Sequence, residues 1–223
     1  MSFDGIILVT MADKYVWRDG VVVYQPGYVA KPEQVFQEIL GKVQGLAKSE
    51  KGILYGRAYE SARRTLQIAD ENARLYAYSG ASAKETYRWD VCPAIQYLRD
   101  QLEASHGVRY NFCLVNVYTP DAYLSFHSDD EDDMASDSVA SISLGQVRTF
   151  KFRPKDKKLH VKKPQQTAER GYWEKKLENG SLLVMSGECQ RVLKHGLPPP
   201  LVKEKVTGVR INLTFRVMKK QSN

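Results

Sequence analysis

A histidine and an aspartate that could share one metal ion stand two positions apart, as His127 and Asp129. On an extended strand, or at the end of one, residues two apart point to the same face, so both side chains can reach a common point. An acidic run follows at residues 130–133, and a histidine beside such a run is more often a solvated loop residue. The pair therefore gains meaning only from a third ligand elsewhere in the chain.

The chain has four histidines, so the candidates for that third ligand are His106, His160 and His195. His106 precedes the strand-rich part and His160 lies in a basic loop. His195 follows the apolar segment 181–185, and it can return to the same end of a barrel. Two histidines and one carboxylate form the ligand set of non-heme Fe(II) sites that keep coordination positions open. We therefore predict a metal site, with iron as the metal, at His127, Asp129 and His195.

The segment 210–217, Arg-Ile-Asn-Leu-Thr-Phe-Arg-Val, divides its side chains by type. Read as a strand, it places Arg210, Asn212, Thr214 and Arg216 on one face and four apolar residues on the other. Such a row of donors suits a small dicarboxylate, because Arg binds carboxylate through parallel, charge-assisted hydrogen bonds. The alternative is an exposed strand with two solvated arginines. The metal-ligand pattern upstream favours the pocket.

The elements that must position these residues can be traced from periodicity. Apolar residues recur at helical spacing after Pro32, and a second helix is expected to begin near Pro93. Residues 51–80 alternate and are rich in Tyr and Arg, which is typical of hairpins. Beyond residue 108 the patterns predict strands at 112–118, 139–144, 149–152, 181–185 and 209–217. This order predicts an α+β chain built on an antiparallel barrel or jelly roll.

Composition narrows the class of protein. A chain of 223 residues can bury one sizeable core, and no apolar run approaches the roughly 20 residues of a membrane span. Three scattered cysteines form no disulfide framework, which fits a reducing compartment. The net charge of +7 and a basic stretch at 148–176 indicate either a polyanionic partner or a solvated basic face. We expect a soluble intracellular protein, nuclear in a eukaryote and cytoplasmic otherwise.

His127-x-Asp129, His195 and Arg210-x-Asn212-x-Thr214-x-Arg216 together resemble the AlkB family of Fe(II)/2-oxoglutarate dioxygenases. The likeness extends from about residue 54 to residue 217. It looks closest to the DNA-repair AlkB homologues of animals, in the segments 111–112, 116–118, 141–145 and 212–216. The resemblance implies a double-stranded β-helix (jelly-roll) core with flanking N-terminal helices and nucleotide-recognition hairpins.

The resemblance also implies a cosubstrate pocket. Arg210 is expected to bind the distal carboxylate of 2-oxoglutarate, and the pocket is completed by Asn116, Tyr118, Asn212, Thr214 and Arg216. A buried structural amide and a core tyrosine are the other interpretations of Asn116 and Tyr118. The chain is then one AlkB-like dioxygenase domain over residues 1–223. It comprises an N-terminal extension with a helix at 1–50, a nucleotide-recognition region and helix at 51–107, and the β-helix core at 108–218.

On the substrate side, the resemblance implies a base pocket walled by Tyr76 and Tyr78, on which a flipped base can stack. Glu131, two residues after Asp129, resembles the acidic residue that reaches the exocyclic amine of the lesion. Paired aromatics at this spacing also occur in ordinary cores, which is the alternative for the two tyrosines.

The same resemblance suggests a surface that holds a DNA strand. Tyr55 resembles the aromatic wedge that fills the gap left by an extruded base, although a plain surface tyrosine is the alternative. Arg57, Arg63 and Arg64 are expected to hold phosphates, which supply affinity but little sequence preference. The basic segment 155–163 lies where duplex-binding relatives carry a loop that grips the partner strand, but its sequence does not closely match theirs.

The implied activity is oxidative demethylation. With Fe(II), 2-oxoglutarate and O2, the enzyme is expected to hydroxylate an N-methyl group on a damaged DNA base such as 1-methyladenine or 3-methylcytosine, which releases formaldehyde and restores the base. A damaged base is already weakly paired, so extruding it costs less than extruding a normal one. The alternatives are the same chemistry on RNA or on a modified base, hydroxylation of a protein or lipid, and a non-catalytic nucleic-acid-binding module. We expect a monomer that acts on methylated DNA, with no membrane partner.

Overall fold

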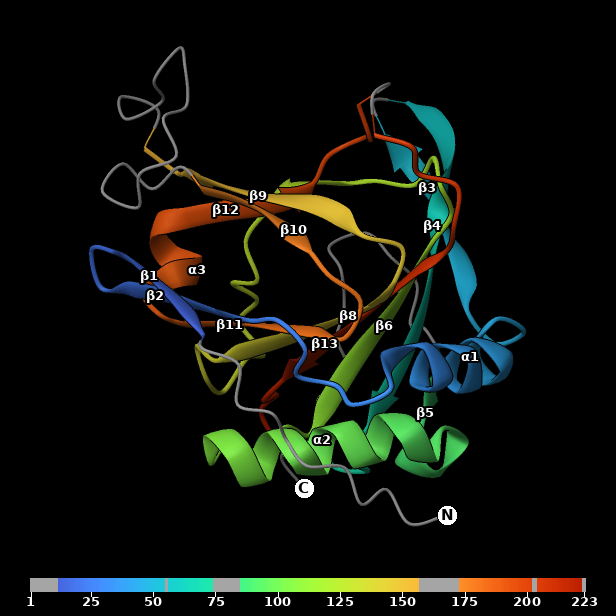
Figure 1. Ribbon diagram of the computed structural model, residues 1–223, viewed down its shortest axis with the longest axis horizontal. Helices are drawn as coiled ribbons and strands as arrows, with labels where there is room; N and C mark the ends of the chain where they lie inside the picture. Colours follow the sequence, from blue (N-terminus) through green and yellow to red (C-terminus); the bar gives the residue numbers. More distant parts are fainter. Residues whose placement is uncertain (1–11, 55, 74–84, 157–172, 202–203, 222–223) are drawn as a thin grey trace.

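Two β-sheets that face each other make up most of the protein (Figure 1). The computed structural model describes residues 12–54, 56–73, 85–156, 173–201 and 204–221. Within these ranges, no helix is long and apolar enough to cross a membrane.

The larger sheet has nine strands in the order β1-β2-β11-β8-β13-β6-β4-β3, with β5 paired to β4. All of its neighbouring strands are antiparallel except for the short β4–β5 pair. The bounds of its strands are β1 Asp13–Trp17, β2 Gly20–Gln25, β3 Lys48–Leu54, β4 Arg57–Ala69, β5 Thr86–Tyr87, β6 Phe112–Tyr118, β8 Val139–Gly145, β11 Ser181–Gly187 and β13 Arg210–Arg216.

The smaller sheet has four strands in the order β10-β9-β12-β7. Their bounds are β7 Leu124–His127, β9 Arg148–Pro154, β10 Trp173–Leu177 and β12 Leu193–Leu197. From β6 to β13 the chain passes back and forth between the two sheets, so each sheet receives four of these eight strands. This winding is that of a double-stranded β-helix, and it confirms the predicted jelly-roll core.

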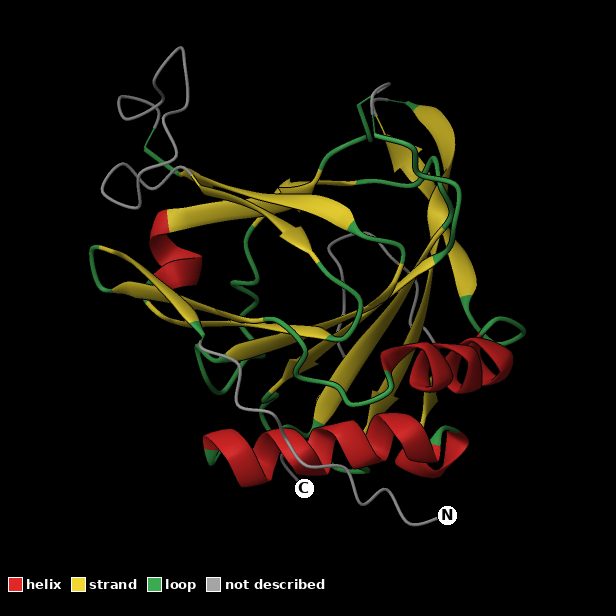
Figure 2. Cartoon of the chain, viewed as in Figure 1, coloured by secondary structure: helices red, strands yellow, loops and turns green. Residues whose placement is uncertain are grey.

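Two helices cover the outer face of the larger sheet (Figure 2). Helix α1 spans Pro32–Val43 and α2 spans Pro93–His106, and each begins with a proline in its first turn, as the sequence predicts. Their apolar stripes pack against the sheet, with Ile39 and Leu102 at 0% exposure. The remaining helical segments are short: η1 Trp89–Val91 and α3 Cys189–Val192.

The larger sheet has one apolar face and one polar face, and β13 shows both. Ile211, Leu213 and Phe215 are 0% exposed and lie in the core beneath the helices. The alternate residues of β13 point into the space between the two sheets. The alternation predicted for this segment is therefore present, although both faces of the strand are buried.

Strand register extends the polar face sideways across the sheet. Arg210 lies opposite Tyr118 of β6, and Tyr118 lies opposite Arg63 of β4. In the next row, Asn212 lies opposite Asn116. Because directly paired residues point to the same side of a sheet, polar groups from three strands line one interior surface.

Candidate metal centre and cosubstrate pocket

The smaller sheet positions two histidines directly against each other. His127 ends β7 and pairs in register with His195 of β12, and their ring centres are 4.4 Å apart. Asp129 follows β7, and its backbone N–H donates a hydrogen bond of 2.9 Å to Oε1 of Gln190 in α3. One ligand atom from each of the three residues lies within 4.8 Å of the others. The structure thus brings together the three predicted metal ligands.

The tautomer of His127 is fixed by its own strand. Its Nδ1 lies 2.9 Å from the carbonyl oxygen of Ser125, and a carbonyl can only accept, so Nδ1 carries the proton. In this tautomer the lone pair is on Nε2, which lies 3.5 Å from Oδ1 of Asp129. This is the usual arrangement of a metal-binding histidine, whose second nitrogen donates to a carbonyl or carboxylate.

Asp129 is a buried carboxylate held by a buried guanidinium. Its side chain is 2% exposed, that of Arg216 is 3% exposed, and Nη2 of Arg216 lies 2.5 Å from Oδ1. Burial alone would raise the pKa of Asp129, but the charge of Arg216, together with the neighbouring His127, holds this pKa well below its usual range. Burial also lowers the pKa of His195 to about 3. An ionised carboxylate and neutral imidazoles are the forms that bind a metal.

One pocket between the sheets joins this triad to the polar face of the larger sheet. Apolar side chains close part of its wall, among them Leu124 and Phe150. The polar residues that line it come from β4, β6, β8 and β13, and they are Arg63, Asn116, Tyr118, Ser141, Arg210, Asn212, Thr214 and Arg216.

Arg210 is a buried cation in this pocket. It is 2% exposed, its Nη2 donates to Oγ of Ser143 at 2.9 Å, and its guanidinium carbon lies 5.2 Å from the ring centre of Tyr118. Burial lowers the pKa of Arg210 to about 10, so it stays charged at neutral pH. Within the described part of the chain, its buried Nε has no hydrogen-bond partner and no carboxylate pairs with it. A buried charge is costly without a partner, so this end of the pocket fits an anionic group from outside.

The amide and hydroxyl of β13 are already ordered. Nδ2 of Asn212 donates to Oγ of Ser141 at 2.7 Å, and Oγ1 of Thr214 donates to Oδ1 of Asn212 at 2.9 Å. These bonds fix the direction of each polar group before any ligand arrives, which lowers the entropy cost of binding.

Comparison with known proteins agrees with this geometry. The family described as the 2OG-Fe(II) oxygenase superfamily matches residues 22–216. The protein DNA oxidative demethylase ALKBH2 of Mus musculus is 31% identical over 193 residues, which cover 84% of this chain and 75% of that protein. The chain belongs to the AlkB family of 2OG-Fe(II) oxygenases. The alpha-ketoglutarate-dependent dioxygenase alkB homolog 3 of Bos taurus is 28% identical over 222 residues, covering 96% of this chain and 71% of that protein.

Membership makes the protein an Fe(II)/2-oxoglutarate-dependent dioxygenase, and its donor set fits both groups. His127, Asp129 and His195 offer two nitrogens and one oxygen to iron, and Arg210 offers an unsatisfied donor to a carboxylate. When bound, iron supplies the activation of O2, with 2-oxoglutarate as the reductant that becomes succinate and CO2.

The three arginines expected to hold phosphates lie in three different environments. Arg57 is exposed at the start of β4. Arg64 is half-buried, and its guanidinium donates to the carbonyl oxygens of Ala47, at 3.2 Å from Nε, and of Gln44. It therefore ties β4 to the segment that follows α1.

Arg63 departs most from the expectation. It is 5% exposed, lines the pocket of the metal triad and donates from Nη1 to Oδ1 of Asn116 at 2.9 Å. A guanidinium buried in this position is not available to a phosphate at the surface, so the phosphate role does not fit it. The alternation of Arg63, Thr65 and Gln67 against Leu66 and Ile68 was the signal that could have placed it inside.

The other substrate-side predictions can be located only in part. Tyr55, Tyr76 and Tyr78 lie outside the described residues, as does the segment 157–163. Glu131 is half-buried in the turn that follows Asp129. Lys155 pairs with Asp130 at 2.7 Å, which brings the start of the basic segment beside the acidic run.

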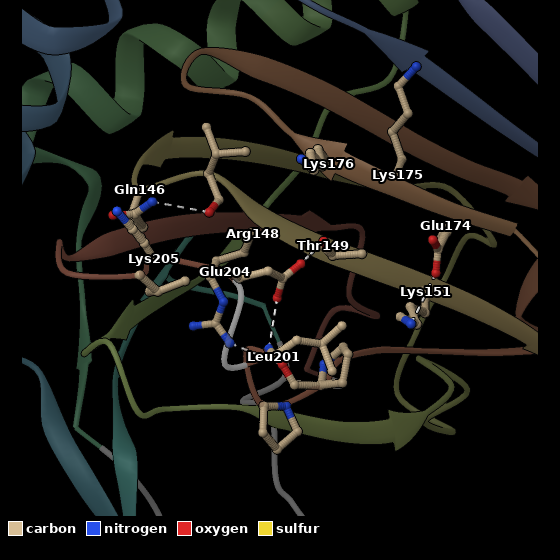
Figure 3. Close-up of a pocket in the computed structure, with 14 residues that line it drawn as sticks. Gln146, Arg148, Thr149, Lys151, Glu174, Lys175, Lys176, Leu201, Glu204 and Lys205 are labelled. Atoms are coloured by element: carbon tan, nitrogen blue, oxygen red, sulfur yellow. Dashed lines mark hydrogen bonds and ion pairs between the residues drawn. The ribbon is translucent and has the colours of Figure 1, made fainter.

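A larger pocket, of about 690 Å³, lies away from the metal ligands, between β9, β10 and the loop after β12 (Figure 3). Figure 3 shows Glu204 directed at Thr149, at 2.7 Å, and at the backbone of Leu201, while Lys151 pairs with Glu174 at 3.0 Å. Its acidic groups thus have partners within the pocket wall, and the chemistry of the family lies in the smaller pocket.

Proposed function

We propose that the protein is a DNA oxidative demethylase, which removes N-methyl groups from damaged bases such as 1-methyladenine and 3-methylcytosine. The observation that carries this proposal is one buried pocket lined both by two histidines and a carboxylate, which can share a metal ion, and by Arg210, whose Nε has no hydrogen-bond partner among the described residues. The names of the ALKBH2 relatives support the choice of substrate class. A net charge of +7 also favours a polyanionic substrate.

The two ends of the pocket bind different parts of the cosubstrate. Arg210 binds the distal carboxylate of 2-oxoglutarate through its guanidinium fork, including the Nε that has no partner in the part of the chain that the structure describes. Asn116, Tyr118, Asn212 and Thr214 complete the pocket by supplying neutral hydrogen-bonding groups along its wall. Arg216 lies at the metal end, where it also holds Asp129.

In the overall reaction, one oxygen atom of O2 enters the N-methyl group and the other enters succinate. The resulting N-hydroxymethyl group loses formaldehyde as its C–N bond breaks, and the electron pair stays on the base nitrogen. The hydroxyl proton is released with the formaldehyde, which neutralises the cationic ring, so the repaired base regains its normal pairing edge.

On the substrate side, we propose Tyr76 and Tyr78 as the stacking wall and Glu131 as the contact to the exocyclic amine. Glu131 is two residues from the ligand Asp129, which keeps it near the metal. Tyr55 is proposed to fill the gap left by the extruded base. Arg57, which is exposed, is proposed to hold a phosphate.

A panel of oligonucleotides tests the proposal. Strands of one sequence carrying 1-methyladenine or 3-methylcytosine, as single-stranded and duplex DNA and as RNA, are incubated with Fe(II) and 2-oxoglutarate and read by mass spectrometry. We expect loss of the methyl group from DNA with matching release of formaldehyde and succinate. Preferential repair of the RNA strands would move the substrate class to RNA, and oxidation of none of them would refute the proposal.

The variant His195→Ala connects the activity to the metal centre. It removes one of three ligands, so formaldehyde release should fall to background while far-ultraviolet circular dichroism is unchanged. Arg88→Ala, at an exposed arginine that does not line the pocket, is the matched control. Formaldehyde release that persists in His195→Ala would show that the activity does not come from this site.

A further inference from the structure

The strongest unassigned feature of the pocket is the contact between Arg63 and Asn116. Nη1 of Arg63 donates to Oδ1 of Asn116 at 2.9 Å, and the two residues are 5% and 2% exposed. They come from different parts of the chain, since Arg63 is on β4 and Asn116 is on β6. Burying an arginine is costly, so a guanidinium kept at this place calls for a role inside the pocket.

The orientation of the Asn116 amide follows from this contact. An asparagine amide offers an oxygen on one side and an NH2 group on the other, and the two ends have nearly the same shape. A guanidinium has donors and no acceptor, so the side that faces Arg63 must be the oxygen. The NH2 group of Asn116 is thereby directed to the opposite side.

That opposite side leads toward the metal end of the pocket. Nδ2 of Asn116 lies 3.4 Å from the carbonyl oxygen of Leu114, a long contact that a better acceptor can replace. Leu114 lines the pocket and pairs with Thr214, so it is one row nearer than Asn116 to Arg216 and Asp129. Asn116 itself lines the pocket, so its NH2 group lies on the side of Asn116 that is nearer to the metal ligands.

We propose that Arg63 is a positioning residue for the cosubstrate, which fixes the Asn116 amide so that its NH2 group donates to an oxygen of 2-oxoglutarate. The inference rests on the cosubstrate pocket proposed above and extends it to β4. Without Arg63 the amide can turn over and present its oxygen to an anionic ligand, which removes a donor and adds repulsion. Arg63 acts through Asn116 and does not need to touch the ligand.

The first test measures binding without turnover. Protein loaded with Mn(II) is titrated with 2-oxoglutarate by calorimetry, for the wild type and for Arg63→Met, Arg63→Lys and Arg88→Met. We expect Arg63→Met to weaken 2-oxoglutarate binding about tenfold to a hundredfold, the range of one charge-assisted hydrogen bond, with Mn(II) affinity unchanged. Arg63→Lys keeps a charged donor and should recover part of the loss. Arg88→Met removes an exposed arginine outside the pocket lining and should leave 2-oxoglutarate affinity unchanged.

The second test asks whether Arg63 acts through the amide. In the Asn116→Ala background, Arg63→Met should cost no further 2-oxoglutarate affinity, because there is no amide left to orient. Isotope-labelled asparagine gives a direct signature. The side-chain NH2 signal of Asn116, assigned by its loss in Asn116→Ala, should be sharp in the wild type and broadened in Arg63→Met.

Several outcomes would overturn the inference. An equal loss of affinity in both backgrounds would mean that Arg63 acts on the cosubstrate directly or only on the fold, and thermal melts separate these two. Unchanged 2-oxoglutarate binding with weakened DNA binding would return Arg63 to a phosphate role. If the wild type binds 2-oxoglutarate but repairs no oligonucleotide, the proposed function fails while the role of Arg63 stands.

Discussion

Replacing Arg216 by methionine should make the stability of the protein depend strongly on metal. Arg216 and Asp129 are 3% and 2% exposed at their side chains, with 2.5 Å between Nη2 and Oδ1. Removing one partner of a buried ion pair costs about 3–5 kcal/mol, because the other charge is left buried. For a chain of this size, each kcal/mol lowers Tm by about 2–4 °C. The metal-free variant should therefore melt roughly 6–20 °C below the wild type.

A bound divalent cation supplies the positive charge that the variant lacks. Saturating Mn(II) should therefore raise the Tm of Arg216→Met by clearly more than it raises that of the wild type, in which Arg216 and the metal repel each other. Differential scanning fluorimetry with Mn(II) and with EDTA measures both shifts. The same comparison also gives the relative metal affinities, since a ligand stabilises according to its occupancy of the folded state.

Arg148→Met is the matched control. Arg148 is also 3% exposed, but it donates to the carbonyl oxygens of Ala122 and Pro198, at 3.1 and 3.0 Å. Its loss should lower Tm without enlarging the Mn(II) shift. If Mn(II) stabilises Arg216→Met no more than it stabilises the wild type, Asp129 does not depend on Arg216 for its charge balance, and the reasoning is refuted.

The sign of the pH dependence follows from the same pair. In the wild type the lowered pKa of Asp129 contributes stability that is present above its unfolded value, about 3.9, and is lost as the pH falls. In Arg216→Met, burial without a counter-charge raises the pKa of Asp129. Protonation of the carboxylate then removes the free-energy cost of burying its charge. The stability difference between wild type and variant should therefore be largest at about pH 8 and shrink toward about pH 4.

Three further predictions concern the rest of the structure. Arg210→Met should weaken 2-oxoglutarate binding by about a hundredfold, because a charge-assisted pair is lost, while Mn(II) binding stays intact; unchanged calorimetric titrations would remove Arg210 from the pocket. All three cysteines are buried, and burial raises the pKa of Cys189 to about 12, so iodoacetamide should modify them only in denaturant, as mass spectrometry can show. Gly145→Ala should lower the urea midpoint markedly, because a Cβ there lies 2.6 Å from the carbonyl oxygen of Val209 and φ is +78°. Gly41→Ala meets nothing within 4 Å on helix α1 and should be neutral or stabilising.

The metal ligands and the arginine strand could be predicted because their evidence is local. His127 and Asp129 are two positions apart, so their side chains point the same way on an extended chain. Polar and apolar residues alternate along β13, which gives the strand two distinct faces. The third ligand could be chosen because the chain has only four histidines. These features needed no knowledge of which strands pair with which.

The position of Arg63 could not be read in the same way, because it depends on pairing between distant segments. The Tyr- and Arg-rich segment around it predicts hairpins, and the family resemblance implies that Arg63 holds a phosphate at the surface. In the structure β4 pairs with β6, with Arg63 opposite Tyr118, so the polar side of β4 continues the interior face of the sheet. Polar and apolar residues do alternate along this part of β4. The alternation alone does not show whether the polar side faces solvent or a pocket, because that depends on which strand lies beside it.

Strands β10 and β12 were missed for a related reason. In β10 the three central residues are Glu174, Lys175 and Lys176, and only the two ends are buried. In β12 a glycine follows His195. Neither segment has the apolar alternation of a strand, and each is held by pairing with its neighbours across long stretches of chain.

The two faces of β13 tie the stability of the fold to the chemistry of the pocket. A shift of one residue in the pairing of β13 would carry its arginines into the helix-covered core and its apolar residues into the pocket. The core side, with Ile211, Leu213 and Phe215 at 0% exposure, makes such a shift very costly, so burial on one face fixes the position of every donor on the other. This explains how a buried polar surface can be kept in place with the Nε of Arg210 lacking a hydrogen-bond partner among the described residues. The burial of apolar side chains on the core face of β13 therefore holds the polar groups of the pocket in place, although this face does not contact the ligand.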